Sequence, residues 1–454
     1  MYLLYSLLLT LGFIALMPRF AIDALRSGKY VTGLRQRLGN LPAINSTASP
    51  LIWLHCVSVG ETQAAQSLVR ALRTDFPNHR LVVSTTTVTG QVVARKTFVN
   101  DAALVFYFPI DLAWVVRRVL RALNPSALLI METELWPRLL HECHARAIPV
   151  ALLNGRISNT SFGRYKLIRP FMRRVLEDLT IALMQSEKDA ACIRELGLLH
   201  ERIAFPGNLK FDSAETAIDE TVTSEIRGRF GLDGTRPLIV AASTHAPEER
   251  VTIEAFKQIK QLRADERARL LVAPRRPERF DEVATLLESS GLTWSRRSGA
   301  HRKDDAICDA ILLDTIGELR SVYPLAQLVF VGGSVAPHGG HNVLEPAANG
   351  ACVITGPHTE NFTAVTRALL DEEALIQLPE QSVSDTPQQL AAVFSQMLSD
   401  ETRRLQIGTR AREVCRGNAG ATARTMQMLS GILSRPAAVD ASAPLSALHA
   451  TTAK

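Results

Sequence analysis

The feature that most constrains the fold of this chain is a regular alternation of two kinds of segment. Short apolar runs rich in β-branched residues alternate with segments of helical periodicity, first over residues 51–186 and again over residues 237–355. Strands that are apolar along their whole length belong to parallel sheets, which helices cover on both faces. The sequence therefore predicts an α/β protein that contains two parallel sheets.

The alternation is interrupted at residues 205–235, a polar stretch with a charged helical pattern and several glycines. This interruption predicts two doubly wound, Rossmann-like domains, over residues 19–210 and 211–435, with a cleft between them. In such sheets ligands bind at the carboxyl ends of the strands. Residues 436–454 are rich in Ala, Ser and Pro, and we expect a disordered tail there. The expected strands occupy residues 51–59, 80–87, 103–110, 127–133, 149–155 and 181–186, then 237–244, 268–274, 310–314, 327–334 and 351–355.

The chain begins with an apolar segment, residues 1–18, that holds no charged side chain. Its length is at the short end of what spans a bilayer, and the basic residues that follow it belong on the cytoplasmic side. We expect an uncleaved, single-pass anchor helix with the rest of the chain on the cytoplasmic side. A monotopic or buried amphipathic helix and a signal peptide are the alternatives. The basic residues that follow are Arg19, Arg26, Lys29, Arg35 and Arg37.

The charge balance and the cysteines narrow the classes of function. A formal net charge of +6 and a pI near 9.1 favour an anionic partner: a nucleotide, a phosphorylated lipid, a membrane surface or a nucleic acid. The six cysteines are scattered without a CxxC pair, which argues against a disulfide framework or a structural zinc site. Reduced thiols in a cytosolic compartment are the simplest interpretation.

The first half of the chain places Glu61 where its first expected strand gives way to a helix. Gly60 permits the tight turn, and the carboxylate lies in the first helical turn, where the helix dipole and free amides favour its ionised form. An ionised carboxylate at a strand end can accept a proton as a general base. The alternative is a glutamate that only stabilises its helix.

Two further stretches of the first half carry charge at the expected cleft. In METELWP, residues 131–137, strand alternation would place Glu132 and Glu134 on one face, ready to contact hydroxyls or a cationic partner. A solvated helix entry is the alternative. In PGNLKFD, Lys210 lies between the halves and could neutralise a carboxylate or a leaving phosphate, or could be an exposed linker residue.

Residues 156–174 mix basic and aromatic side chains. This composition suits an anionic lipid surface or a phosphorylated amphiphile. A nucleic acid is not expected as the partner, because no nucleic-acid-binding motif accompanies the segment. A plain solvated helix remains an alternative.

The second half offers groups that suit a phosphate and a sugar. Ser243 ends the first strand of this half, and Arg275 and Arg276 follow the second strand, where guanidinium groups match phosphate oxygens. The most specific stretch is FVGGSVAPHGGHNVLEPAANG, residues 330–350. Its glycines permit close backbone approach, Ser334 and Asn342 can donate to phosphate, and Glu345 can bind sugar hydroxyls.

Metal and dinucleotide chemistry fit the second half poorly. His338 and His341 could bind a metal ion, but a third ligand at a suitable spacing is missing. The chain has no DxD motif, so we expect neither a bridging divalent ion nor another cofactor. No GxGxxG motif follows a strand, which disfavours a dehydrogenase.

The chain resembles the 3-deoxy-D-manno-octulosonic acid (Kdo) transferase family of lipopolysaccharide assembly over almost its full length. The resemblance is carried by HCVSVGET, METELWP, NGRIS, GNLKFD, AAST, APRRPERF, DTIGEL and GGSVAPHGGHNVLEPA in this order and spacing. It implies a GT-B glycosyltransferase that uses CMP-Kdo as donor and a lipid A precursor, lipid IVA, as acceptor. It also implies inverting, metal-independent transfer at the cytoplasmic face of the inner membrane.

The resemblance also implies roles for single residues. Glu61 takes the position of the family's general base, and Lys210 that of its lysine. The stabilising acid is Glu132, with Glu134 as the less favoured choice. Another nucleotide-sugar transferase, a nucleotide-sugar epimerase and a membrane-anchored nucleotide-binding protein remain the rival functions. The implied donor-binding residues are Ser243, Pro274, Arg275, Ile316, Gly317, Glu318, Ser334, Asn342 and Glu345.

Overall fold

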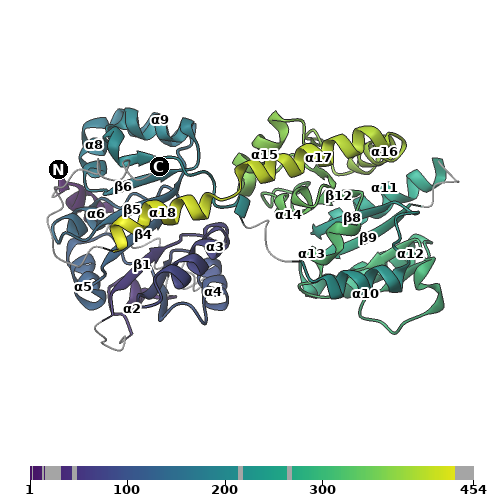
Figure 1. Cartoon of the computed structure of the whole chain (residues 1–454), viewed down its shortest axis with the longest axis horizontal. Coiled ribbons are helices and arrows are strands. Elements are labelled where there is room, and N and C mark those ends of the chain that lie inside the picture. Colours follow the sequence, from purple (N-terminus) through teal and green to yellow (C-terminus); the bar gives the residue numbers. More distant parts are fainter. Residues whose placement is uncertain are drawn as a thin grey trace, which may run out of the picture. The chain divides into compact units, whose positions relative to one another are not determined.

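The computed structural model describes residues 1–2, 4–12, 15, 32–42, 49–212, 218–262 and 268–434. The chain forms two compact units. Unit 1 contains Met1–Asp212 together with Gly420–Lys454, and unit 2 contains Ser213–Ala419. Each unit is built on one parallel seven-stranded sheet, so the prediction of two parallel α/β domains is confirmed (Figure 1).

The sheet of unit 1 has the strand order β3-β2-β1-β4-β5-β6-β7. The order reverses between β1 and β4, which pair directly with each other. A reversal of this kind opens a crevice at the carboxyl ends of the two strands, where ligands bind in open α/β sheets. The strands are β1 (Leu51–His55), β2 (Arg80–Thr85), β3 (Leu104–Tyr107), β4 (Ala127–Met131), β5 (Val150–Gly155), β6 (Ile181–Met184) and β7 (Ile203–Ala204).

Helices cover both faces of this sheet because its central strands are buried on both sides. Trp53 lies in one core cluster with side chains of α5, α6, α8 and α9, and Leu54 lies in the other with side chains of α3 and α4. The alternation of neighbouring residues between two cores is what a covered parallel strand requires. The helices are α2 (Leu34–Arg37), α3 (Val59–Asp75), α4 (Val88–Thr97), α5 (Ala113–Leu123), α6 (Pro137–His144), α7 (Asn159–Leu167), α8 (Arg169–Glu177) and α9 (Glu187–Leu196).

Unit 2 repeats the same plan with the strand order β10-β11-β9-β8-β12-β13-β14. Here the order reverses between β8 and β12. The strands are β8 (Leu238–Thr244), β9 (Arg269–Pro274), β10 (Trp294–Arg296), β11 (Ala310–Leu312), β12 (Leu328–Val331), β13 (Cys352–Thr355) and β14 (Ile376–Gln377). The helices are α10 (Glu220–Phe230), α11 (Glu248–Leu262), α12 (Phe280–Ser290), α13 (Leu319–Val322), α14 (Leu344–Ala348), α15 (Thr363–Asp371), α16 (Thr386–Ser399) and α17 (Glu401–Asn418).

The last helix, α18 (Ala421–Leu433), belongs to unit 1 and not to the C-terminal domain expected over 211–435. It carries Met426, Leu429 and Ile432 into the core that α3 shares, and it is drawn in yellow in Figure 1. Asp212 fixes its start, because its carboxylate accepts from the Gly420 N–H at 2.8 Å. The chain therefore returns to its first unit after completing the second. The tail expected at 436–454 lies outside the described residues.

The described residues do not support the predicted single-pass anchor. Among residues 1–2, 4–12 and 15, which are the described part of the expected anchor, no helix is long and apolar enough to cross a bilayer. Residues 4–12 are helical, and this helix is tied to unit 1 by two tyrosines. Tyr2 hydrogen-bonds Asp178, and the Tyr5 hydroxyl donates to Asp111 at 3.0 Å. Exposed leucines occupy other positions of the same helix: Leu4, Leu7, Leu8 and Leu11.

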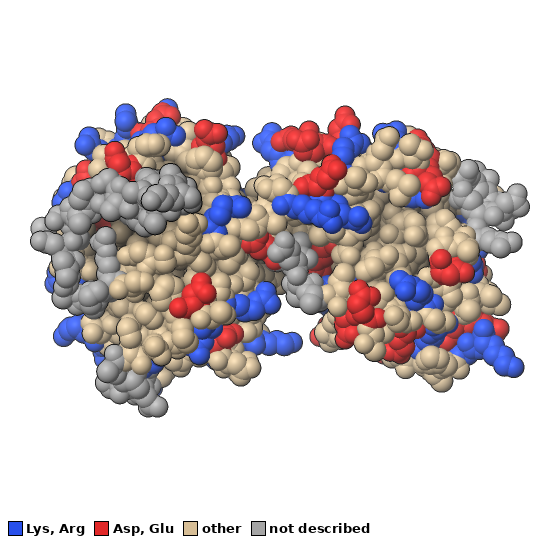
Figure 2. All heavy atoms as spheres, in the orientation of Figure 1, with Lys and Arg blue, Asp and Glu red and all other residues tan. Residues whose placement is uncertain are grey.

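The basic and aromatic segment 156–174 forms α7 and most of α8. Its aromatic side chains are less exposed than expected, because Phe162, Tyr165 and Phe171 pack against the core of unit 1. The large apolar side chains that reach solvent lie between the two helices: Leu167 is 85% exposed and Ile168 is 48% exposed. On the face drawn in Figure 2, basic and acidic side chains are interspersed over each unit.

Candidate active site

The reversal point of unit 1 brings together three of the predicted site residues. Glu61 lies in the first turn of α3, which follows β1, and Glu132 comes directly after β4. Lys210 Nζ lies 3.2 Å from Glu132 Oε1, so these two form an ion pair. Glu61 and Glu132 thus follow the two strands that pair at the reversal, β1 and β4, and Lys210 contacts Glu132.

The carboxyl group of Glu61 is held by its own turn. Oε2 accepts the Val57 N–H at 2.7 Å, and Oε1 accepts the Ser58 hydroxyl at 3.0 Å. Ser58 is the N-cap of α3, and its side chain accepts from the Glu61 N–H in return. The glutamate thus helps to cap its helix, as the alternative interpretation required. Capping and catalysis are compatible here, since each carboxylate oxygen has more than one lone pair.

Burial changes the expected protonation of Glu61. The side chain is 7% exposed. Desolvation, followed by the negative charge of Glu132, raises the pKa of Glu61 to about 8, against the opposing effect of the bonds from Val57 and Ser58. From the sequence we predict that the helix N-terminus keeps Glu61 ionised. This prediction is wrong, because the free-energy cost of burying the charged carboxylate exceeds its stabilisation by the helix dipole. A carboxyl group with a pKa near neutrality can accept and return a proton.

Glu132 lies in a strained backbone conformation. Its φ is 52°, in the left-handed region that residues other than Gly and Asn rarely adopt. Its N–H donates to the Leu153 carbonyl at 2.8 Å, which fixes the turn at the end of β4. Strand alternation ends at Met131, so the expectation that Glu132 and Glu134 share a strand face does not hold. Burial and then Glu132 raise the pKa of Glu134.

Asn154 positions the lysine, and sequence reasoning missed it. Its Oδ1 accepts the Leu209 N–H at 2.9 Å, and the next residue, Lys210, donates its N–H to Asn208 Oδ1 at 3.0 Å. Asn208 in turn donates to Gln185 Oε1 at 3.1 Å. Asn154 also has a left-handed backbone, with φ 52°. An asparagine at a strand end, within the NGRIS motif, is the signal that could have identified it.

The reversal point of unit 2 is organised by a buried carboxylate, Glu248, that sequence reasoning also missed. Its Oε2 accepts the Gly333 N–H at 2.7 Å and the His245 N–H at 3.0 Å. Its Oε1 accepts the Ser334 N–H at 2.8 Å and the Val335 N–H at 2.9 Å. Four amide donors on one carboxylate tie the turn after β8 to the glycine-rich turn after β12. A glutamate at the start of α11 was the available signal.

Ser334 is committed to this framework. Its hydroxyl donates to the Val331 carbonyl at 2.6 Å and accepts the Gly356 N–H at 2.9 Å. The side chain is fully buried. Ser334 therefore shapes the glycine-rich turn, and its hydroxyl is not offered to a ligand as the sequence argument expected.

Ser243, Pro274 and Arg275 lie on neighbouring strand ends. Thr244 pairs with Pro274 in the register of β8 and β9, and the Arg275 N–H donates to the Thr244 carbonyl at 2.9 Å. Ser243 has φ 54°, a third left-handed residue at a strand end. The side chains of Arg275 and Arg276 are exposed, and within the described ranges neither has an acidic partner. Two guanidinium groups that lack carboxylate partners suit a phosphate.

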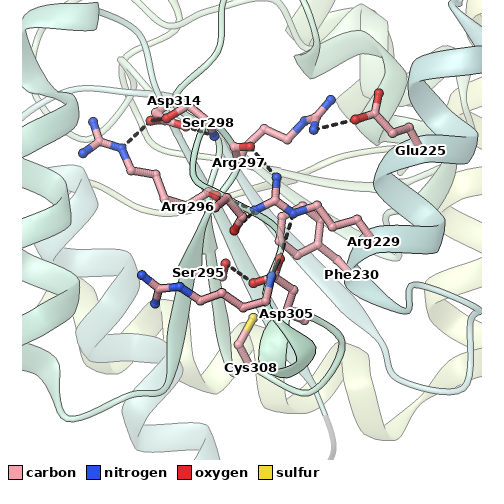
Figure 3. Close-up of polar contacts among 12 residues, drawn as sticks. Glu225, Arg229, Phe230, Ser295, Arg296, Arg297, Ser298, Asp305, Cys308 and Asp314 are labelled. Carbon is pink, nitrogen blue, oxygen red and sulfur yellow. Dashed lines mark hydrogen bonds and ion pairs between the residues drawn. The ribbon is translucent and has the colours of Figure 1, made fainter.

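The segment that contains Ile316, Gly317 and Glu318 is braced by arginines. Arg297 holds the Glu318 carboxylate through two bonds, at 3.0 Å from Nε and 2.9 Å from Nη2. Gly317 has φ 96°, and Ile316 is 78% exposed. Figure 3 shows the surrounding network: Arg296 pairs with Asp314, Arg297 with Glu225, and Arg229 with Asp305. The turn is therefore held by side chains of residues 296–298, and α10 in turn contacts Arg297 through Arg229 and Glu225.

Glu345 and Asn342 form a second braced pair at the start of α14. Arg320 donates to Glu345 Oε1 from Nη2 at 2.7 Å and from Nε at 3.0 Å. Asn342 Nδ2 donates to the same oxygen at 3.2 Å. Within the described residues, no group of three or more His, Cys, Asp or Glu side chains is placed to hold a metal ion.

Two parallel-sheet units of this kind also form the fold of several solved structures. UDP-GlcNAc 2-epimerase from Neisseria meningitidis, solved with UDP-GlcNAc, has this fold, with a TM-score of 0.54, 9% identity, and coverage of 84% of this chain and all of its own. A glycosyltransferase from Rickettsia africae has a TM-score of 0.53 at 12% identity and covers 86% of this chain and all of its own.

The sequence comparisons show that the chain is a glycosyltransferase. It belongs to the 3-deoxy-D-manno-octulosonic acid transferase family. It is 32% identical to the transferase of Haemophilus influenzae over 91% of this chain and 94% of that protein. It is 34% identical to the transferase of Bordetella pertussis over 83% of this chain and 86% of that protein. A sequence model of the family, described as 3-deoxy-D-manno-octulosonic-acid transferase (kdotransferase), matches residues 32–213.

Proposed function

We propose that this protein transfers Kdo from CMP-Kdo to a hydroxyl of the lipid A precursor, with Glu61 as the general base. The observation that carries the proposal is the buried Glu61 carboxyl group at the strand reversal of unit 1, with its pKa raised to about 8. A group of that pKa is matched to proton transfer near neutral pH. The identity of the transferred sugar, Kdo, and its use in lipopolysaccharide are inferred from membership of the family.

In the proposed reaction the ionised Glu61 carboxylate accepts the proton of the acceptor hydroxyl. The acceptor oxygen attacks the anomeric carbon of Kdo while the bond to the phosphate of CMP breaks, and CMP leaves with the bonding electron pair. The bonds from Val57 and Ser58 fix the direction of the carboxyl group during this step. One positioned base of this kind contributes about 10² to 10⁴ in rate.

Glu132 and Lys210 have a supporting electrostatic role in this proposal. The negative charge of Glu132 raises the basicity of Glu61. Lys210 neutralises part of that charge through the 3.2 Å ion pair. The pair thereby keeps Glu61 basic without leaving an isolated anion in a half-buried site. The same carboxylate would favour the positive charge that develops on the sugar as CMP leaves.

The donor is proposed to bind unit 2 at its strand reversal. Arg275 and Arg276 would contact the phosphate, and the carboxylates of Glu318 and Glu345 would accept from hydroxyl or amino groups of the nucleotide. Both carboxylates are already held in place, by Arg297 and Arg320. Fixed acceptors of this kind lose little freedom when the donor binds.

We propose that unit 1 lies against the surface of the inner membrane at its cytoplasmic face. The helix of residues 4–12 presents exposed leucines, and Leu167 and Ile168 are exposed between α7 and α8. Basic side chains stand beside them, as interfacial binding to anionic lipid requires. An acceptor embedded in lipid would then be presented to the same unit that carries Glu61. The basic side chains are Arg164, Lys166, Arg169, Arg173 and Arg174.

Mass spectrometry of the reaction products tests the function. The purified protein is incubated with CMP-Kdo and the lipid precursor, and the expected lipid product is heavier by whole Kdo residues, with CMP released in equal amount. Release of CMP without any heavier lipid, or conversion of a nucleotide sugar in the absence of acceptor, would contradict the proposal. The second outcome would favour an epimerase.

A further inference from the structure

Three histidines gather in unit 2 where β8 ends and the glycine-rich segment begins. His245 follows β8, and His338 and His341 belong to the glycine-rich segment. Nε2 of His245 lies 2.9 Å from Nε2 of His341, and the two rings are stacked with centroids 5.1 Å apart. The ring of His338 lies 4.7 Å from that of His245. The proposed reaction gives these rings no role.

The contact between two Nε2 atoms restricts the protons that the pair can carry. In the neutral pair one ring must donate its Nε2–H, and the other must accept with a bare Nε2. The donating ring then has a bare Nδ1 that can take up one proton. The product is an imidazolium that donates to a neutral imidazole, which is a charge-assisted hydrogen bond. A second added proton would place two like charges in contact, so the pair is built to bind one.

The groups that face the pair make its protonation depend on an anion. Burial first, then His338 and the guanidinium groups of the β9 end, lower the pKa of His245 to about 4. Burial and then Arg275 lower the pKa of His341 to about 3. From α11, Glu248 faces His245, but its oxygens accept four backbone N–H groups. The guanidinium groups that contribute to the effect on His245 are Arg275, Arg276 and Arg279.

We propose that the His245–His341 pair is part of an anion site that takes up one proton when a phosphate or a carboxylate binds beside it. An anion that pairs with the exposed Arg275 would offset the positive charge that disfavours protonation, and the bound imidazolium would attract the anion in turn. The inference rests on the proposed function to this extent: a CMP-sugar acid donor carries both a phosphodiester and a carboxylate. Binding and proton uptake would then strengthen each other.

Titration calorimetry in paired buffers of different ionisation enthalpy measures this uptake. The phosphate probe is the methyl ester of CMP, whose phosphodiester does not titrate near neutral pH. Free Kdo is the carboxylate probe, and cytidine is the probe without an anion. With the wild-type protein we expect uptake that approaches one proton per bound anion near pH 6 and falls toward none at pH 8. The affinity should weaken by up to about tenfold per pH unit over the range of uptake.

The matched variants are His245→Gln and His341→Gln. Glutamine places an amide where Nε2 lies and can keep a hydrogen bond, but it does not titrate. Each variant should bind the anionic probe that the wild-type protein binds. Its proton uptake should be near zero, and its affinity should not change with pH. The control is His301→Gln, a change of an exposed histidine elsewhere in unit 2, which should take up protons as the wild type does.

The outcomes separate this inference from the proposed function. Uptake with the CMP ester alone assigns the site to the phosphate, and uptake with Kdo alone assigns it to the carboxylate. Anion binding with no proton uptake, or uptake unchanged in both glutamine variants, would overturn the inference and leave the transferase proposal intact. If neither the CMP ester nor free Kdo binds the wild-type protein, the proposed donor site and this inference both fail.

Discussion

The variant Glu61→Gln distinguishes two hypotheses about Glu61: that it is a buried, protonated carboxyl group, or that it is an ordinary ionised helix cap. Glutamine keeps the shape of the side chain, and its oxygen can still accept the Val57 N–H. The pKa of Glu61 is raised from 4.5 to about 8 in the folded protein. The contribution of this group to the unfolding free energy is therefore fully present only below pH 4.5, the pKa of the unfolded state. It is lost as the pH rises to about 8, the pKa of the folded state. Glutamine has no such dependence.

The size of the effect follows from the shift. One pKa unit corresponds to about 1.4 kcal/mol, so the full loss is on the order of 5 kcal/mol. About 2 to 3 kcal/mol of it falls between pH 6 and pH 9. The variant should therefore gain about that much unfolding free energy relative to the wild type over this range. Urea unfolding is followed by tryptophan fluorescence in a Trp294→Phe background, because the other three tryptophans, Trp53, Trp114 and Trp136, all belong to unit 1.

The same variant tests catalysis. We expect turnover to fall by about 10² to 10⁴, while CMP affinity, which depends on unit 2, stays unchanged. A stability difference that is constant between pH 6 and pH 9 would show that Glu61 is ionised in the folded protein, and the reasoning from burial would fail. Full turnover by the variant would leave Glu61 with its capping role alone.

Three further predictions concern Glu132, the proposed donor site and the exposed leucines of the N-terminal helix. Glu132→Gln removes a negative charge that raises the pKa of Glu61, so the rise of kcat/KM with pH should move to lower pH; an unmoved profile would contradict the coupling. Arg275→Ala should weaken CMP binding at least tenfold by calorimetry while acceptor affinity is kept, and unaltered CMP affinity would remove Arg275 from the donor site. Leu7→Gln together with Leu8→Gln should reduce sedimentation with anionic vesicles, because it removes exposed apolar surface without changing the charge. The control is Val99→Gln, a change of an exposed apolar residue elsewhere in unit 1, which should leave sedimentation unchanged. Unchanged sedimentation of the double variant would contradict the proposed membrane contact.

The strand ends that carry the site could be read from the sequence, because their signal is local. The strand expected over residues 237–244 ends at Thr244 as predicted, in β8. The strand expected over residues 51–59 ends earlier, at His55, and Ser58 already caps α3. Both β1 and β8 lie at the reversal point of their sheet. The strands that were missed, β7, β10 and β14, contain two or three residues each, which is too short for any periodicity to appear.

Properties that depend on distant residues could not be read in this way. The protonation of Glu61 is set by burial and by Glu132, which arrives on another strand. The left-handed turn at Glu132 has no signature in its residue type, since glutamate rarely adopts that conformation. Helix α18 has an ordinary amphipathic pattern, and only its contacts assign it to unit 1. The role of Glu248 likewise requires the glycine-rich turn to be in place.

The most direct test of the account is the pKa of Glu61 itself. The protein is labelled with ¹³C at the glutamate side-chain carboxyl carbon, its NMR spectrum is followed from pH 5 to pH 9.5, and Glu61→Gln identifies the resonance by its loss. The account predicts a titration midpoint near pH 8, which moves lower in Glu132→Gln. A midpoint near 4.5 would mean that the carboxylate is already ionised throughout this range, and Glu61 would then lack the basicity on which the proposed transfer depends.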